Sequence, residues 1–379
     1  MSRHLVVVGG GVIGLSIAWQ AVQRNFVVTL IDRGLIGAEA SWASAGILPY
    51  VNPQTAQHPL EKLAAASHKL HPRWYLELRT ATGIDYEHHV AGTIHFARTR
   101  AEKASLIGLE QHHRDEQSPF QTLTMDELGK AIPSMQHLIE SHQVTYATKL
   151  LADAQLRSPR FLAALAAACR QNGVRIVEQV GDVRLTSRNN LIHSAESEAF
   201  DSIAGDEFCV ASGAWSGELL RPLGLKIDFV PIRGQMVFYQ LDRRPFSSVV
   251  YEGGNYLVPR TDGTLLVGST LEDVGFDRST TPEAIDVLSR FAGELVPDIA
   301  GRAPNRVWAG LRPATFDGFP YIGRVVDFRN LTLAAGHFRA GIHLAPITAV
   351  AICQLLEELP FAIDLTPFRA TRGRSQISN

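Results

Sequence analysis

A glycine-rich stretch near the N-terminus limits the possible folds more than any other part of this sequence. An apolar run of strand length, Leu5–Val8, is followed at once by Gly9, Gly11 and Gly14 in G-x-G-x-x-G spacing. Apolar residues then recur at helical spacing, and a second apolar run ends at Asp32. This order predicts a strand–helix–strand unit that binds a dinucleotide.

Each of the three glycines in the G-x-G-x-x-G pattern has a physical task. Gly9 permits a tight turn, Gly11 lets the backbone approach a pyrophosphate, and Gly14 lets helix and strand pack closely. The helix N-terminus offers N–H groups and a positive dipole to the phosphates. Asp32 is placed to accept hydrogen bonds from ribose hydroxyls and disfavours a 2′-phosphate, so NADP is not expected. The motif alone does not distinguish FAD from NAD.

The composition sets broad limits. A chain of 379 residues suggests two domains, and 45% hydrophobic with 20% charged residues is typical of a soluble globular protein. A net charge of −2 provides no field for nucleic acid or an anionic membrane. No membrane-spanning helix and no signal peptide are expected, and the three cysteines look like reduced core residues, so we expect a cytoplasmic protein.

Small residues dominate the segment that follows Asp32. Residues 34–49 contain two serines, Ser41 and Ser44, among glycines and alanines. Small side chains allow a large flat ligand to lie against the backbone, and serine hydroxyls can donate to phosphate. The alternative is a small-residue helix that packs closely on the sheet.

The rest of the chain alternates between helical and strand patterns. Neighbouring histidine pairs at 88–89 and 112–113 lack acidic or cysteine partners at ligand spacing, so no metal site is expected. The tail, residues 371–379, is polar. Helices are expected over 58–82, 102–113, 124–132 with Thr124 as cap, 162–171, 281–295 and 347–356, and strands over 90–97, 174–177, 183–185, 226–240, 248–258, 264–268 and 331–335.

Taken together, these pieces resemble the D-amino-acid oxidase family of flavoenzymes, and within it the glycine oxidases of thiamin thiazole synthesis. The resemblance covers nearly the whole chain. Its motifs are 9–14, 41–48, 210–216, 256–260, 308–323 and 336–344. It implies an α/β fold with a Rossmann-like FAD-binding domain of the GR2 type. A second, α+β domain on a largely antiparallel sheet would bind substrate.

The resemblance also implies boundaries and a cofactor. Residues 1–85, 145–225 and 305–379 would form a discontinuous FAD-binding domain, and residues 86–144 and 226–304 the substrate domain. The FAD would be noncovalent, because Gly310 stands where related sarcosine oxidases carry the attaching cysteine. The residues implied to contact FAD are Gly9, Gly11, Val12, Ile13, Gly14, Asp32, Arg33, Ser41, Ala45, Gly46, Ile47, Asp182, Ala211, Gly213, Trp215, His337, Phe338, Arg339, Ala340, Gly341 and Ile342.

Three residues are implied on the substrate side. Arg312, in Gly-Leu-Arg-Pro, matches the arginine that grips an amino-acid carboxylate, Tyr256 matches a tyrosine that supports the same group, and Arg339 lies at the flavin edge. The alternatives are a surface ion pair for Arg312, a core aromatic for Tyr256 and a solvated helix-start charge for Arg339. Hydride would pass from the substrate Cα to flavin N5, so no catalytic side chain is nominated.

The implied reaction is oxidative deamination of glycine, sarcosine or a small D-amino acid, yielding an oxo acid, ammonia and, with oxygen, hydrogen peroxide. Gly254, Leu271 and Ala340 depart from the expected histidine, methionine and asparagine, so the pocket wall and the preferred amine are open. A dehydrogenase that passes electrons to a quinone and a noncatalytic FAD-binding module stay as alternatives. The amine and oxygen are the expected partners, and a homo-oligomer is possible.

Overall fold

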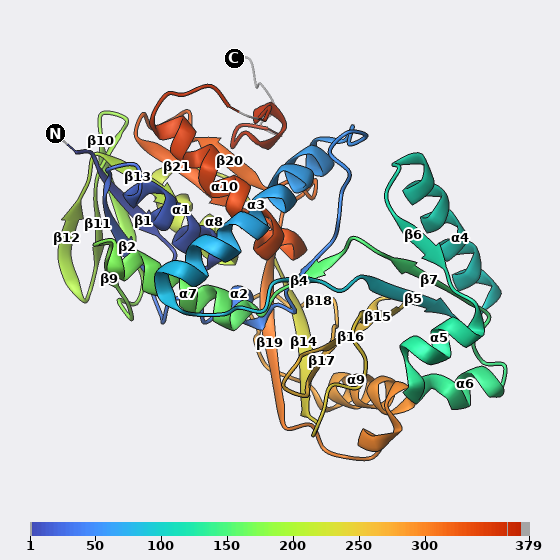
Figure 1. Ribbon diagram of the computed structural model, residues 1–379. Helices are drawn as coiled ribbons and strands as arrows, with labels where there is room; N and C mark the ends of the chain where they lie inside the picture. Colours follow the sequence, from blue (N-terminus) through green and yellow to red (C-terminus); the bar gives the residue numbers. More distant parts are fainter. Residues whose placement is uncertain (1, 362, 373–379) are drawn as a thin grey trace.

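The computed structural model describes residues 2–361 and 363–372, so residues 373–379 of the expected polar tail lie outside the described residues. Two large sheets organise the chain. Figure 1 shows the first beside the N-terminus, with its helices packed on it, and the second below and to the right of it. The expected α/β fold with a second, largely antiparallel α+β region is confirmed.

The first sheet has six strands in the order β20-β21-β13-β1-β2-β9. The pairs from β21 to β9 are parallel, and only the edge pair β20–β21 is antiparallel. Parallel strands with both faces covered should be apolar throughout, and β1 is, with Leu5, Val6 and Val7 fully buried. The bounds are β1 (His4–Val8), β2 (Val27–Ile31), β9 (Arg175–Val177), β13 (Glu207–Val210), β20 (Tyr321–Arg324) and β21 (Leu331–Ala335).

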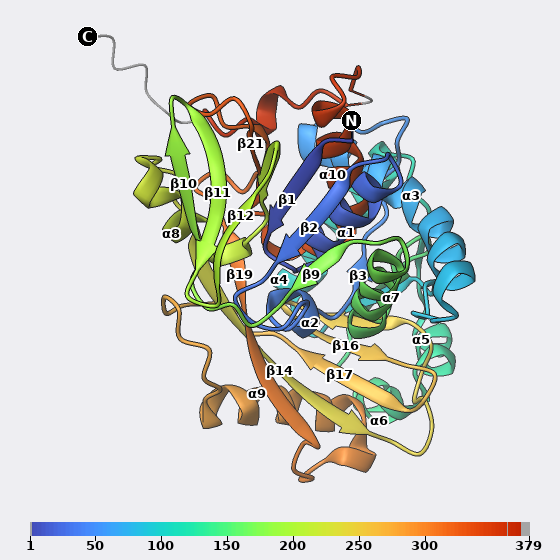
Figure 2. The same ribbon diagram turned by 90° about the vertical axis from the view of Figure 1, so that its left-hand side faces the viewer.

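Helices cover one face of this sheet and a small three-stranded sheet covers the other. Figure 2 shows the small sheet standing apart from the helices across the first sheet. The helices are α1 (Val12–Val22), α3 (Pro59–Thr82), α7 (Ser158–Gln171) and α10 (Gly341–Leu356). The opposite face carries β10 (Arg184–Arg188), β11 (Leu191–Ser197), β12 (Phe200–Ala204) and the short α8 (Ser216–Leu220).

The last helix begins earlier than the sequence predicts. We expect it from Ile347, after Pro346, but α10 begins at Gly341 and contains Pro346 in its second turn. A proline there removes only one intrahelical bond, and burial of the surrounding apolar residues compensates. The stretch Phe338–Leu356 is also long and apolar enough to cross a membrane, with a mean hydropathy of 1.4, but 67% of it is buried inside the structure. It packs against α1 and α3 as a core helix.

The second sheet has nine strands and only one parallel pair, β15–β5. Its order is β18-β14-β17-β16-β15-β5-β7-β6, and β19 pairs with the other side of β14. The bounds are β5 (Thr93–Ala97), β6 (Phe120–Thr122), β7 (Tyr146–Leu150), β14 (Val230–Gln240), β15 (Val249–Glu252), β16 (Asn255–Pro259), β17 (Thr264–Gly268), β18 (Glu272–Asp273) and β19 (Arg306–Ala314).

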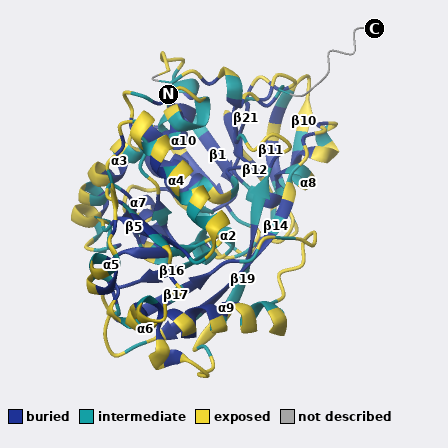
Figure 3. Cartoon of the chain, turned by 90° about the vertical axis from the view of Figure 1, so that its right-hand side faces the viewer, coloured by how far each residue is buried: buried dark blue, intermediate teal, exposed yellow. Residues whose placement is uncertain are grey.

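The two faces of this second sheet have different neighbours. Alternating residues such as Val237 and Leu265 pack under α5 (Met125–Ala131), α6 (Gln136–Glu140) and α9 (Pro282–Leu295). The residues between them, such as Met236 and Leu266, form a cluster with Ala45 from the other half of the chain. Strand side chains alternate between faces, so one face is core and the other is free to line a site. Figure 3 shows β16 and β17 largely buried, with exposed residues on the outer sides of the helices.

Most expected elements are present. The capping box of Thr124 and Glu127 is confirmed at the start of α5, and Thr281 caps α9. The remaining elements are α2 (Ala40–Ala43), α4 (Arg100–Asp115), which packs on β5 and β7, and a short sheet of β3 (Ile47–Leu48), β8 (Ala154–Gln155) and β4 (His89–Val90).

The domain boundaries stay a prediction. Two strands that the predicted boundaries assign to the cofactor domain, β7 and β19, lie in the nine-stranded sheet. Both continue hydrogen-bond ladders with strands of the substrate half, β5 for the first and β14 for the second.

Candidate active site

A cavity of about 810 Å³ lies where the two large sheets meet. Its walls come from the turn after β1, residues 39–49, the ends of β13 and β21, the start of α10, and the inner face of β14, β16 and β19. Parallel α/β sheets place ligand sites at the carboxyl ends of their strands, and the turn after β1 is such an end. Segments distant in sequence therefore meet here.

The glycine turn is built to bring backbone against backbone. Gly9 has φ +112°, and a Cβ there would lie 2.4 Å from the Ala211 carbonyl oxygen. A Cβ on Gly14 would lie 1.8 Å from the Gly9 carbonyl oxygen, so any larger residue would push α1 away from β1. Gly11, the residue before α1, makes no side-chain cap, and this helix N-terminus opens on the cavity. The turn has the close packing and free donors that a pyrophosphate requires.

Asp32 is held by this turn. One carboxylate oxygen accepts the Gly10 N–H at 2.6 Å and the other accepts the Gly34 N–H at 2.8 Å. Burial raises the pKa of Asp32, while these two amide bonds oppose the shift. Each carboxylate oxygen has a second lone pair, and Asp32 lines the cavity. The carboxylate is therefore oriented and still able to accept hydroxyl groups.

The wall formed by residues 41–47 combines polar anchoring with close packing. The Ser41 hydroxyl accepts the Val12 N–H at 3.0 Å, at the start of α1. Gly46 has φ +71°, and a Cβ there would lie 2.0 Å from the Leu156 carbonyl oxygen. Small residues thus leave room in the cavity on one side and permit tight packing on the other.

A second helix N-terminus faces the cavity. A turn of 3-10 helix, Phe338–Ala340, leads into α10, and the residue before α10 provides no side-chain cap. The imidazole of His337 is bonded to Thr348 at 3.0 Å, and burial lowers its pKa to about 3, so it is neutral. Backbone amides and the dipole of a 16-residue helix therefore supply positive potential at this end.

The far end of the cavity is open and polar. Arg33 lies 5.2 Å from the Trp215 ring centroid and 3.8 Å from the carboxylate of Asp182. The Asp182 side chain is 95% exposed, which fits the outer end of a long ligand better than its reacting end.

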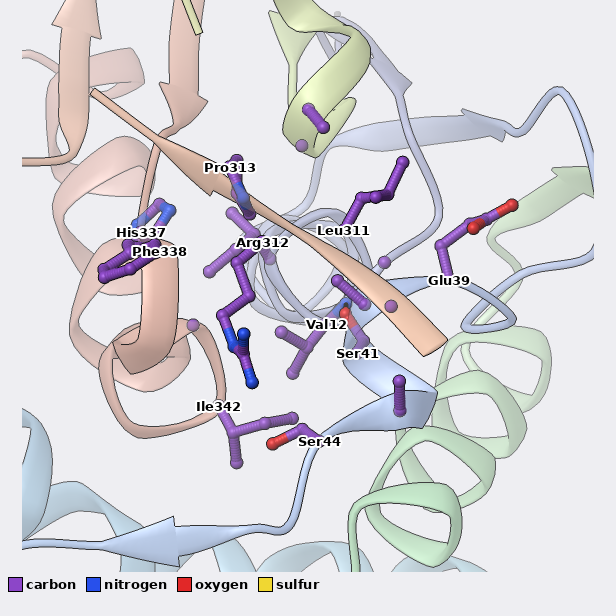
Figure 4. A pocket seen from close by; sticks show the side chains of 18 of the residues that line it. Val12, Glu39, Ser41, Ser44, Leu311, Arg312, Pro313, His337, Phe338 and Ile342 are labelled. Atoms are coloured by element: carbon purple, nitrogen blue, oxygen red, sulfur yellow. Dashed lines mark hydrogen bonds between the residues drawn. The ribbon is translucent and has the colours of Figure 1, made fainter. Parts of the chain in front are cut away.

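Arg312 reaches into the cavity from β19. Figure 4 shows its side chain extending toward Ile342 and Ser44. One guanidinium nitrogen donates to the Thr270 carbonyl at 3.2 Å and another to the Ser269 hydroxyl at 2.7 Å. Burial lowers the pKa of Arg312, and Arg339 lowers it further while Tyr256 raises it.

Arg312 has no carboxylate partner within 4.0 Å among residues 2–361 and 363–372. A surface ion pair, the alternative for this residue, is therefore not what the structure has. A half-buried cation with free donor capacity is suited to bind an anion.

Tyr256 and Arg339 lie beside it in different environments. The Tyr256 hydroxyl donates to the Met236 sulfur at 3.4 Å, a weak bond that a better acceptor can replace. Arg339 is exposed at the rim, with its guanidinium 5.8 Å from the Phe338 ring centroid. Of the three departures noted in the sequence, Gly254 and Ala340 line the cavity, whereas Leu271 is 58% exposed and lies outside it.

The structure brings the candidate residues together. All of them line this cavity except Gly14, which acts behind it by holding α1 against β1. Whether each one touches ligand stays a prediction. Four further residues line the cavity although the sequence does not predict them there: Gly234, Met236, Tyr251 and Ser269. A Cβ on Gly234 would lie 2.2 Å from the Arg312 guanidinium, so this glycine makes room for it. No local motif marks these four, because the pairing of strands distant in the sequence brings their segments to the cavity.

Comparison with known proteins decides the family. The family model described as DAO, FAD dependent oxidoreductase, matches residues 4–355. This chain belongs to that family. It is 36% identical over 376 residues to glycine oxidase of Pseudomonas aeruginosa, covering 99% of this chain and 100% of that protein.

Two further matches extend the comparison. The crystal structure of glycine oxidase from Geobacillus kaustophilus superposes with a TM-score of 0.89 at 32% identity, covering 98% of this chain and 99% of that one. The bifunctional protein ThiO/ThiG of a Nostoc species is 30% identical over 382 residues, covering 100% of this chain and 56% of that protein. The resemblance inferred from the motifs is confirmed, and the chain is an FAD-dependent amino-acid oxidoreductase.

The residues present fit FAD. The cofactor is long and flat, with a central pyrophosphate, and the cavity offers a glycine turn at one helix N-terminus, an oriented carboxylate and a second helix N-terminus. Among the described residues, no group of three or more histidine, cysteine or acidic side chains could hold a metal ion.

Proposed function

We propose that this protein oxidises a small amino acid or amine, such as glycine, sarcosine or a small D-amino acid, with FAD as electron acceptor and oxygen as the final oxidant. The observation that carries the proposal is Arg312, a half-buried cation without a carboxylate partner among the described residues, beside a cavity that fits FAD. The relatives named glycine oxidase support the substrate class.

Substrate positioning follows from the charges on this wall. A carboxylate is costly to bury unless it is paired and hydrogen-bonded. Arg312 offers a planar fork of donors that matches a carboxylate, and the Tyr256 hydroxyl can turn from its weak sulfur acceptor to a substrate oxygen. Anchoring the carboxylate fixes the rest of a small substrate, and orientation is a large part of the rate gain in such reactions.

The glycine turn after β1 and the N-terminus of α10 would hold FAD, and the chemistry that FAD would supply is acceptance of a hydride from the substrate Cα. Oxygen would then take up the two electrons together with two protons as hydrogen peroxide. The amino acid loses that hydride from its neutral-amine form and becomes an imine. Imine that no further reaction consumes is hydrolysed by water to an oxo acid and ammonia, or to an oxo acid and methylamine when the substrate is sarcosine. The protein holds the carboxylate and shapes the cavity, and we nominate no side chain as a base.

The proposal includes a place in metabolism and in the cell. We propose that the imine formed from glycine serves thiamin thiazole synthesis, supported by the match to one part of the bifunctional ThiO/ThiG protein.

We also propose a cytoplasmic enzyme. The three cysteines are free and buried, and burial raises the pKa of each to about 12, so they are inert thiols.

The test is an anaerobic mixing experiment with the yellow holoenzyme. Glycine, sarcosine and D-alanine are added in turn, and loss of flavin absorbance is followed before air is admitted. We expect bleaching with at least one of these amines and peroxide after air. Bleaching without peroxide in air, with recovery by a quinone, would replace the oxidase by a dehydrogenase. No bleaching with any amine would favour the noncatalytic FAD-binding module.

A further inference from the structure

Arg260 is a buried arginine that the cofactor and substrate assignments do not use. It follows β16, is 2% exposed and is the largest fully buried side chain in the described structure. One terminal nitrogen donates to the Gln155 side-chain oxygen at 2.9 Å, and the other donates to the Ala45 carbonyl at 2.6 Å. Its Nε has no hydrogen-bond partner among the described residues.

The charge on Arg260 is not neutralised locally. Among the described residues it forms no ion pair, and the nearby carboxylates are engaged by another arginine. Arg157 bonds Glu87 at 3.2 Å and Asp262 at 2.6 Å. Burial lowers the pKa of Arg260 to about 10, so it is still a cation at neutral pH. A buried charge paired only with neutral dipoles is rare, because desolvation is costly.

The contacts of Arg260 lead directly to the cavity wall. Ala45, which accepts its hydrogen bond, lines the cavity, as do Ser44 and Gly46. The peptide between Ala45 and Gly46 is held at both ends, because its carbonyl accepts from Arg260 and its N–H donates to the Ser44 hydroxyl at 3.2 Å. The Arg260 cation polarises the Ala45–Gly46 peptide by bonding its carbonyl oxygen. The positive N–H end of this peptide and the charge of Arg260 itself both favour negative charge in the cavity.

We propose that Arg260 is a positioning residue of the cofactor site, which fixes the Ala45–Gly46 peptide and supplies buried positive charge that stabilises the reduced, negatively charged flavin. The inference rests on the proposed site, in which residues 41–47 lie along the cofactor. This role depends on the charge of Arg260, whereas a packing role would not. A carboxylate in place of the neighbouring Gln155 side chain would cancel the charge without removing the arginine.

Three variants separate charge from packing. Arg260→Met removes the charge and both bonds, and Arg260→Lys keeps the charge but loses the fork. Gln155→Glu keeps an oxygen for Arg260 to bond and places a compensating carboxylate beside it. Gln155 is fully buried and its amide nitrogen lies 3.2 Å from His89, so FAD content and the unfolding midpoint are measured for every variant.

The readout is the equilibrium between oxidised and reduced flavin, measured by anaerobic titration of each holoenzyme against a reference dye. For Arg260→Met and Gln155→Glu we expect the equilibrium constant for reduction to fall about tenfold, the order of effect of one buried charge acting through protein interior. Arg260→Lys should stay within about threefold of the parent. Where Arg260→Met does not retain FAD, Gln155→Glu alone carries the test.

An equilibrium constant for Gln155→Glu within twofold of the parent would overturn the proposal and leave Arg260 a packing residue. The same holds if Arg260→Lys falls as far as Arg260→Met. No amine substrate enters this titration, so failure of the proposed amine oxidation leaves its outcome unaffected, and a negative titration leaves the amine experiment unaffected.

Discussion

The two walls of the cavity are built by different means. The wall formed by the first sheet and residues 41–47 is mainly backbone. Gly9, in the turn after β1, and Gly46, before β3, are packed against carbonyl oxygens at distances that exclude a Cβ. The wall of the second sheet is side chains, with Arg312 on β19, Met236 on the adjacent β14 and Tyr256 on β16, which β17 separates from β14. A backbone wall is fixed by the fold itself. A side-chain wall can change residue by residue while the sheet persists, so cofactor binding should be less variable than substrate preference.

The largest effect on activity is expected from a substitution in the side-chain wall. Arg312→Ala should cost on the order of 3–5 kcal/mol in kcat/KM for an amino acid, because a buried carboxylate loses its partner. Arg312→Lys should recover part of this loss, since it restores the charge but not the fork. FAD content should be normal in both, as measured by absorbance of the purified protein.

A matched control lies on the same strand. Arg306 is also on β19 but is exposed and outside the cavity, so Arg306→Ala should leave kcat/KM nearly unchanged. Loss of FAD from the Arg312 variants would contradict the separation of the two walls.

A substitution in the backbone wall should lower protein stability and FAD affinity. Gly14→Ala places a Cβ 1.8 Å from the Gly9 carbonyl, so helix or strand must move, at a cost of about 3 kcal/mol in unfolding free energy. FAD affinity should fall with it. Urea denaturation and FAD titration of the apoprotein measure the two effects.

The control for this variant is another helical glycine. Gly108 lies in α4 with nothing within 4 Å of a built Cβ, so Gly108→Ala should be neutral or stabilise by up to about 1 kcal/mol. If the two substitutions behaved alike, close packing at Gly14 would not be what the backbone wall depends on.

A substitution of Asp32 tests the carboxylate that the turn after β1 holds. Asp32→Ala should weaken FAD binding by roughly 1–3 kcal/mol, because buried ribose hydroxyls and the Gly10 N–H lose their acceptor. Turnover of the FAD-saturated variant should hardly change. An unchanged FAD dissociation constant would show that Asp32 only closes the turn.

The smallest expected effect concerns covalent attachment. A Cβ on Gly310 would lie 2.6 Å from the Ala43 Cβ, so the strand is packed too closely here for a linking side chain. Acid precipitation should therefore leave all yellow colour in solution. Colour retained in the protein pellet would contradict noncovalent binding.

The backbone wall could be predicted from the sequence because its signals are local. The strand, glycines, helix and Asp32 are neighbours in the chain, and their geometry follows from their spacing. The full fold class, by contrast, is what the resemblance to the D-amino-acid oxidase family implies, and motifs spread along the whole chain carry that resemblance. The start of α10 was predicted wrongly because Pro346 reads as a break, whereas burial decides the outcome.

The side-chain wall was harder to predict from the sequence. The sequence predicts no strand where β19 lies, since its glycines and prolines are unusual in strands, and its pairing with β14 joins distant parts of the chain. Gly234 is an example of a residue whose role depends on this pairing, because it leaves space for the guanidinium of Arg312, 78 residues further along the chain. Arg260 ends the motif 256–260, but nothing local marks it as a buried charge, because an arginine beside a turn normally lies at the surface.

The central claim is that Arg312 binds a substrate carboxylate. The measurement is the rate of anaerobic flavin reduction by the parent and by Arg312→Ala, with glycine or sarcosine and with benzylamine, an amine that has no carboxylate. We predict a loss of on the order of 3–5 kcal/mol for the amino acid and a much smaller one for benzylamine. Equal losses for both substrates would contradict the claim and assign Arg312 a structural role.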